Sequence, residues 1–119
     1  MTLTAGLTVF SSDLAAARSF YEGILAMDVL ETRADAFVVS RAGLELTVEG
    51  GARPRKRGRR WMEEAGVYVT LRTADWDRFH RDLVARGATF LGDVAADSDG
   101  KRYAGLADPD GLLIEIAER

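Results

Sequence analysis

The sequence reads Gly43-Leu44-Glu45-Leu46 near the end of its first half and Ile114-Glu115-Ile116 near the end of its second. Side chains of a strand alternate between the two faces of a sheet, so both stretches predict a strand with an apolar face and a glutamate on the other face. The second stretch follows Asp108-Pro109-Asp110-Gly111, whose residue types are typical of a tight turn. The sequence therefore predicts equivalent final strands in two related halves.

Both halves also lead up to this strand in the same order. Apolar patterning predicts a strand, a helix and three further strands in each. In the first half we expect strands at 3–10, 27–32, 36–40 and 44–48, with a helix at 14–25. In the second half we expect strands at 67–73, 89–94, 103–107 and 112–117, with a helix at 76–84. Ser11-Ser12-Asp13 and Thr73-Ala74-Asp75 supply side-chain oxygens that can cap the two helices.

This order predicts an α+β fold. Helix follows strand once in each half, unlike the repeated alternation of a doubly wound parallel sheet. We expect two βαβββ modules whose curved mixed sheets form a cup-shaped pocket. One domain would cover residues 1–119, with module one at 1–50, a basic linker at 51–66 and module two at 67–119.

Composition narrows the functional classes. The formal net charge of -3 gives no reason to expect nucleic acid or an anionic membrane as a partner, and cysteine is absent. No apolar run approaches the roughly 18 residues of a membrane span, and the first residues have no pattern of a secretion signal. We therefore expect a cytoplasmic protein.

A basic run lies between the halves. Six of the eight residues at 53–60 are lysine or arginine. One interpretation is a patch that binds anions or nucleic acid, and the other is a solvated linker. The run has no accompanying pair of stacking aromatic residues, which favours the linker.

The same alternation predicts the lining of the pocket. Glu45 and Glu115 point away from the helices, and other residues of the first and last strands share their faces. The expected ligand-binding residues are Thr8, Phe10, Thr47, Tyr68, Thr70 and Arg72. Such a mixture of hydroxyl, aromatic and charged groups suits a small polar or aromatic ligand. Each residue also has an alternative interpretation. The glutamates can be solvated charges on the open face of the strands, Tyr68 can pack in the wall of the pocket, and Arg72 can form an ion pair with one of the glutamates.

Several of these motifs together resemble the vicinal oxygen chelate superfamily, which includes glyoxalase I, bleomycin-resistance proteins and extradiol dioxygenases. The motifs are Ser12-Asp13-Leu14 before a helix with Phe20-Tyr21 and Leu25, the stretch 43–46, and 108–116. They occur in the right order over nearly the whole chain. The resemblance implies the double βαβββ fold, a small-molecule ligand and a homodimer.

The resemblance also implies where a divalent metal ion would bind in the enzymes. The four metal positions fall on Gly6, Glu45, Tyr68 and Glu115 in this sequence. Glycine has no donor atom and a neutral phenol is a poor ligand, so only the glutamates match. Two carboxylates could hold Mg²⁺ or Mn²⁺ loosely, whereas Zn²⁺ or Fe²⁺ sites normally include histidine. The one histidine, His80, lies in the predicted second helix, where we expect it to pack or face solvent.

We therefore expect a small-molecule-binding protein that lacks the full metal site. The alternative is an enzyme with Glu115 and Glu45 as catalytic residues. It would be a divalent-metal-dependent lyase, isomerase or dioxygenase, or would use one glutamate as a general base. A weaker alternative is an interaction module with 53–60 as its contact surface. Trp61 is expected at a pocket mouth or dimer interface, and Trp76 in the core.

Overall fold

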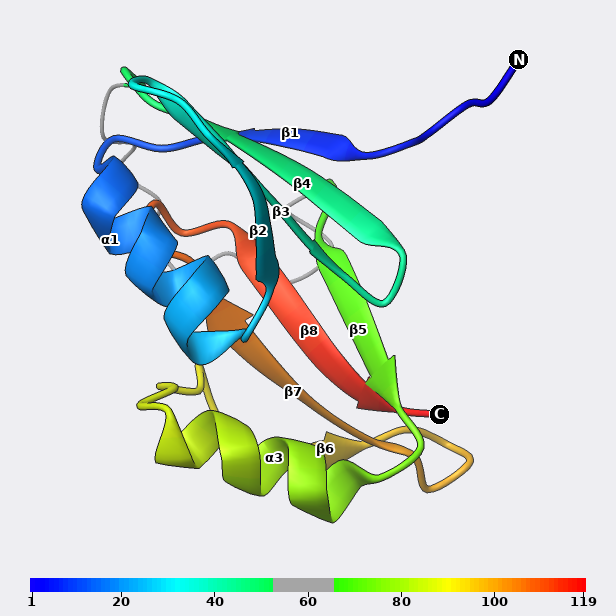
Figure 1. The fold of residues 1–119 in the computed structure, drawn as a ribbon. Helices are drawn as coiled ribbons and strands as arrows, with labels where there is room; N and C mark the ends of the chain where they lie inside the picture. Colours follow the sequence, from blue (N-terminus) through cyan, green and yellow to red (C-terminus); the bar gives the residue numbers. More distant parts are fainter. Residues whose placement is uncertain (53–65) are drawn as a thin grey trace. The chain divides into compact units, whose positions relative to one another are not determined.

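The computed structural model describes residues 1–52 and 66–119. The chain divides into two compact units, Met1–Arg55 and Lys56–Arg119. Each unit contains a strand, a helix and three strands in that order (Figure 1). The predicted basic segment 53–60 and Trp61 lie outside the described residues.

The first unit is a four-stranded mixed sheet with one helical segment. Strand β1 is parallel to β4, and the pairs β4–β3 and β3–β2 are antiparallel, so the strand order is β1-β4-β3-β2. The elements are β1 (Leu7–Phe10), α1 (Leu14–Arg18), the π-helix η1 (Ser19–Ile24), β2 (Asp28–Thr32), β3 (Ala36–Arg41) and β4 (Leu44–Glu49).

The second unit repeats this topology. Its strand order is β5-β8-β7-β6, again with the first strand parallel to the last and antiparallel pairs elsewhere. The elements are β5 (Val69–Thr73), α3 (Trp76–Ala85), β6 (Ala95–Ala96), β7 (Arg102–Ala107) and β8 (Leu113–Glu118). The predicted α+β fold of two βαβββ modules is thereby confirmed.

Equivalent aspartates start both helices. The side chain of Asp13 accepts a hydrogen bond of 3.1 Å from the backbone N–H three residues later, and Asp75 does the same at 3.2 Å. The hydroxyls of Ser11 and Thr73 in turn accept from the backbone N–H groups of Asp13 and Asp75. These bonds satisfy N–H groups that the first helical turn leaves without partners, as the sequence predicts.

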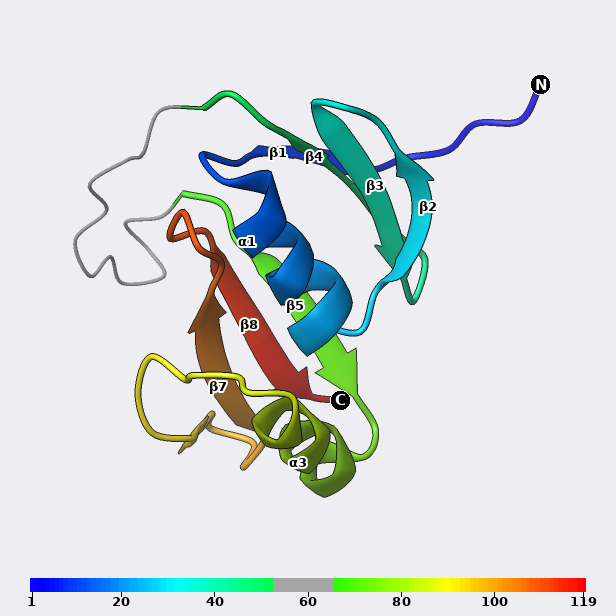
Figure 2. The same cartoon turned by 60° about the vertical axis from the view of Figure 1, so that its left-hand side comes forward.

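The helices cover one face of each sheet (Figure 2). In the first unit, the guanidinium of Arg18 in α1 lies 5.7 Å from the centre of the Phe37 ring of β3. In the second unit, Arg102 of β7 reaches α3, where it pairs with Asp77 at 3.1 Å and lies 5.6 Å from the centre of the Trp76 ring. These contacts identify the helix-covered face of each sheet.

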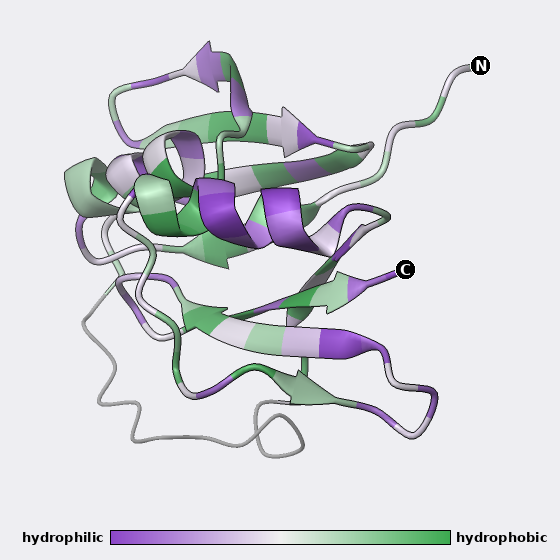
Figure 3. Cartoon of the chain, turned by 90° about the horizontal axis from the view of Figure 1, so that it is seen from below, coloured by the Kyte–Doolittle hydropathy of each residue, from purple (hydrophilic) through white to green (hydrophobic). Residues whose placement is uncertain are grey.

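Strand alternation separates the buried core from the glutamates. Leu46 and Val48 of β4 and Ile114 and Ile116 of β8 have almost no exposed surface and lie on the helix-covered faces. Figure 3 shows hydrophobic and hydrophilic residues alternating along the strands. Each sheet therefore has a second face, called here the glutamate face, which carries Glu45 in the first unit and Glu115 in the second.

Two strands differ from their predicted lengths because of their partners. The expected strand 3–10 is paired only from Leu7, which lies opposite Leu46. In this parallel register Leu3 and Thr4 would lie opposite the turn at Ala42 and Gly43, which offers no strand to pair with. The expected strand 67–73 likewise begins at Val69, opposite Ile114.

The predicted strand 89–94 is wrong. Phe90 forms an isolated bridge with Leu106, and the paired strand β6 comes later, at Ala95–Ala96. The Phe90 ring stacks on His80 of α3, with ring centres 4.8 Å apart. This stacking draws residue 90 towards the helix, and the chain bends before β6 pairs.

The predicted helix 14–25 is present, but its second part is a π-helix instead of an α-helix. It is α-helical to Arg18 and then a π-helix to Ile24. Phe20 and Tyr21 are both buried, with edge-to-face rings 5.0 Å apart. Both rings of this π-helix thus belong to the core of the first unit.

Candidate functional site

In the first unit, β1 and β4 bring the predicted site residues onto one face. Thr8 lies opposite Thr47, and strand alternation puts Phe10 and Glu45 on the same side. Phe10 is 55% exposed, whereas Glu45 and Thr47 are half-buried. The register also places Ser40 of β3 beside Glu45, a neighbour that the sequence analysis missed.

In the second unit, β5 and β8 do the same. Thr70 lies directly opposite Glu115, and Arg72 lies one row further along the same face. Tyr68 is half-buried and immediately precedes β5. The site residues thus form one group on each unit, and the cup-shaped pocket predicted between the groups stays a prediction.

The register also reveals residues around Glu115 that the sequence analysis missed. Gly105 of β7 lies opposite Glu115. A Cβ atom built on Gly105 would lie 3.5 Å from a methyl carbon of Leu113 and 3.7 Å from one of Leu91. Strand alternation already predicts Leu113 on the same face as Glu115, whereas only the pairing of β7 with β8 brings Gly105 and Leu91 to this face, and the sequence alone does not fix that pairing.

Glu115 is in an unusual electrostatic environment for a strand glutamate. Burial raises its pKa, and the positive charge of Arg72 opposes this with a smaller lowering effect. Within the described residues, Glu115 forms no ion pair or hydrogen bond with a side chain. A carboxylate with a raised pKa and no fixed partner can accept a proton or a hydrogen bond from a ligand.

Glu118, on the other face of the same strand, provides a contrast. It holds Arg102 through two oxygens, at 3.2 and 3.0 Å, and accepts a further bond from the Arg102 backbone N–H. These bonds lower the pKa of Glu118 to about 2. Glu118 is thus committed to a structural ion pair, while Glu115 is not.

The four positions that would hold a metal ion fit that role poorly. A Cβ atom built on Gly6 would lie 2.6 Å from the backbone carbonyl oxygen of Glu45, a distance that real Cβ atoms essentially never show. Position 6 thus has neither a donor atom nor space for a side chain on this backbone. Among the described residues, no group of three or more histidine, aspartate or glutamate side chains could hold a metal ion.

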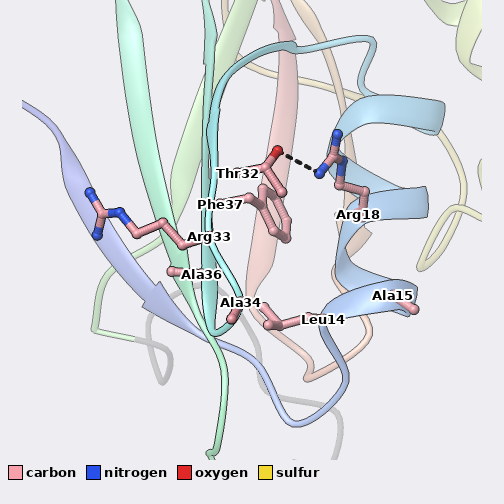
Figure 4. A pocket seen from close by; sticks show the side chains of 8 residues that line it. All are labelled: Leu14, Ala15, Arg18, Thr32, Arg33, Ala34, Ala36 and Phe37. Carbon is pink, nitrogen blue, oxygen red and sulfur yellow. Dashed lines mark hydrogen bonds between the residues drawn. The ribbon is translucent and has the colours of Figure 1, made fainter.

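A shallow groove in the first unit lies outside the predicted site. It has a volume of about 280 Å³ and lies between α1 and the β2–β3 connection (Figure 4). At one end, Arg18 donates a 3.0 Å hydrogen bond to the hydroxyl of Thr32 and also pairs with Glu22. The lining residues are Leu14, Ala15, Arg18, Thr32, Arg33, Ala34, Ala36 and Phe37.

His80 is a packing residue of the second unit. Its ring stacks between those of Trp76, at 5.7 Å between ring centres, and Phe90, at 4.8 Å. Trp76 is buried, as predicted. All three rings belong to the interface of α3 with its own sheet, on the face opposite Glu115.

Comparison with known proteins adds the family. The profile of the Glyoxalase/Bleomycin resistance protein/Dioxygenase superfamily matches residues 5–116. No curated protein matches the chain in sequence. In the part of the chain that is described, no helix has the length and apolar character needed to cross a membrane.

Solved structures share the fold at low sequence identity. A glyoxalase/bleomycin resistance protein/dioxygenase from Alicyclobacillus acidocaldarius has a TM-score of 0.80 and 19% identity, over 97% of this chain and 89% of that one. The fosfomycin resistance protein FosX from Listeria monocytogenes has a TM-score of 0.76 and 16% identity, over 100% and 94%. A bleomycin resistance determinant encoded on transposon Tn5 has a TM-score of 0.72 and 23% identity, over 99% and 98%.

Proposed function

Because the chain belongs to the Glyoxalase/Bleomycin resistance protein/Dioxygenase superfamily, we propose that it binds a small molecule on its glutamate faces without a four-residue metal site. The ligand-binding residues would be Thr8, Phe10, Thr47, Tyr68, Thr70 and Arg72, together with the two glutamates. We further propose that it works in the cytoplasm as a homodimer.

The close approach at Gly6 is the observation that carries this proposal. The resemblance to the family's enzymes puts one metal ligand at position 6, just before β1, and the carbonyl oxygen of Glu45 occupies the space that a side chain there would need. The remaining candidates are two carboxylates and a phenol. Mg²⁺ keeps six oxygen atoms around it, so two carboxylates would leave most of this shell to water and hold the ion only loosely.

The residues that remain are suited to binding. Phe10 offers an exposed aromatic surface, and the hydroxyls of Thr8 and Thr47 lie beside it on the same face. Thr70 and Arg72 supply further hydrogen-bond donors near Glu115. A few directed polar groups on an otherwise apolar surface are typical of small-molecule sites.

Ligand titrations with and without a chelator test this proposal. Metal-free bleomycin, fosfomycin and the fluorescent dye 1-anilinonaphthalene-8-sulfonate are suitable probes, because two relatives are named for resistance to the antibiotics and the dye reports apolar surface. We expect at least one probe to bind with the same affinity in EDTA as in a metal-containing buffer. Loss of all binding in EDTA would contradict metal-independent binding.

The raised pKa of Glu115 favours a second candidate, an enzyme in which this carboxylate acts as a general base. Once a substrate is found, Glu115→Gln should lower kcat by about a hundredfold or more, the usual contribution of general base catalysis. Asp93→Asn, at an exposed position, is the matched control. Unaltered turnover in Glu115→Gln would remove Glu115 from the mechanism.

A further inference from the structure

Two charged groups on the glutamate face of the second unit are close in the sheet but not joined. Glu115 lies opposite Thr70, and Arg72 is two residues further along β5 on the same face. The two strands are parallel, and a strand spacing of about 4.8 Å with a rise of about 3.3 Å per residue puts these two backbones roughly 8 Å apart, within reach of long side chains. The positive charge of Arg72 acts to lower the pKa of Glu115. No ion pair within 4.0 Å joins them in the described part of the chain.

The opposite face of β8 shows what a structural pair looks like in this protein. The guanidinium of Arg102 forms an ion pair with the carboxylate of Glu118, at 3.0 Å between nitrogen and oxygen, and a second ion pair with Asp77. The guanidinium of Arg102 thus donates its hydrogen bonds to carboxylates of the protein itself. Arg72 is exposed and Glu115 is half-buried, and neither side chain forms an ion pair with another residue of the described ranges 1–52 and 66–119.

We propose that Glu115 and Arg72 together bind the head of a ligand that carries a hydrogen-bond donor next to a carbonyl oxygen, as a carboxamide does. This inference rests on the proposed function and names the chemical class of its ligand. The N–H of the carboxamide donates to the carboxylate of Glu115, and the carbonyl oxygen accepts from the guanidinium of Arg72. The hydroxyl of Thr70, beside Glu115, provides a further polar contact.

Charge explains why a neutral head with both groups fits best. A free carboxylate is attracted by Arg72 and repelled by Glu115, whereas a free ammonium group experiences the reverse. A carboxamide satisfies both protein groups without opposing either one. A hydrogen bond to a charged group contributes enough to change affinity by about tenfold, so the preference should be measurable with simple compounds.

The neighbouring residues accommodate the apolar remainder of such a ligand. Gly105 lies opposite Glu115 in the third strand of the row and has no side chain to fill the surface. Leu113 and the 54% exposed Leu91 flank it. The leucine methyl groups occupy the space directly over Gly105, so an aromatic ring attached to the carboxamide can pack against the exposed side of Leu91 next to it.

Three probes with the same ring and different heads test the inference in the full-length protein. Benzamide, benzoate and benzylamine are titrated while the backbone amide NMR signals of residues 70, 72, 105 and 115 are followed. We expect benzamide to bind about tenfold more tightly than the other two and to shift these signals. Equal affinities for the three compounds would overturn the inference.

Two variants assign the two roles. Glu115→Gln should weaken benzamide and strengthen benzoate, because the repulsion of the carboxylate is removed. Arg72→Gln should weaken benzamide and strengthen benzylamine for the corresponding reason. Arg81→Gln, at an exposed position of α3, is the matched control and should leave all three affinities unchanged. Affinities that do not respond to either site variant would also overturn the inference.

The outcome separates this inference from the proposed function. If the probes bind the glutamate face with no preference for the head, the ligand class is wrong and small-molecule binding stands. If neither these probes nor the antibiotics and the dye bind the protein, the proposed function itself fails.

Discussion

A side chain at position 6 should destabilise the first unit. A Cβ atom there would lie 2.6 Å from the carbonyl oxygen of Glu45, whereas ordinary contacts begin at about 3.4 Å. In Gly6→Ala the strand β1 must therefore move away from β4 by several tenths of an ångström or more. Overpacking of this kind costs about 1–3 kcal/mol, and the lower entropy of the unfolded alanine chain offsets up to about 1 kcal/mol.

The expected net loss is thus about 1–2 kcal/mol, or roughly 4–8 °C in Tm for a chain of this size. Urea unfolding followed by circular dichroism measures it. Gly105→Ala is the matched control, because its Cβ would meet only ordinary contacts at 3.5 Å or more. We expect the control to stay within about 1 kcal/mol of the wild type. If Gly6→Ala is as stable as the wild type, β1 has room for a side chain and the argument against a metal ligand there is wrong.

Three further predictions concern single residues. Ala42→Gly should stabilise the protein by about 0.5 kcal/mol in urea unfolding, because Ala42 has a φ of +53° in the β3–β4 turn; a loss of stability would contradict the strain at this residue. The ion pair with Arg102 lowers the pKa of Glu118 from 4.5 to about 2. The pair therefore stabilises the fold fully at a pH above 4.5, the pKa of the unfolded chain, and this stabilisation is lost as the pH falls towards 2. Wild type should therefore lose more stability over that range than Glu118→Gln, and parallel curves would refute this. The pKa of Glu115 is raised by burial, so Glu115→Gln should be more stable than wild type at pH 7, with the difference vanishing at low pH; a less stable variant would show that the carboxylate supports the fold.

Local sequence patterns predicted the fold well where each element depends on its own residues. The caps at Asp13 and Asp75 follow from short polar side chains before an apolar helix face. The glutamates at 45 and 115 follow from strict alternation with buried aliphatic residues. In these cases the physical cause lies within a few residues of the feature.

The sequence did not predict features that depend on contacts between residues far apart in the chain. The stacking of Phe90 on His80 replaces the expected strand, and neither residue type signals the other in the sequence. The start of β1 depends on its register with β4, and the contact of Gly6 with the carbonyl oxygen of Glu45 depends on the same register. The sequence could show that glycine lacks a donor atom, but not that the backbone closes the position.

The central claim is that the chain binds its ligand without the metal site of the related enzymes. The most direct measurement is a calorimetric titration of the metal-stripped protein with Mn²⁺, repeated with Glu115→Gln. We expect no binding tighter than about millimolar in either protein, because the set of oxygen ligands is incomplete. Micromolar binding of Mn²⁺ that is lost in Glu115→Gln would contradict it.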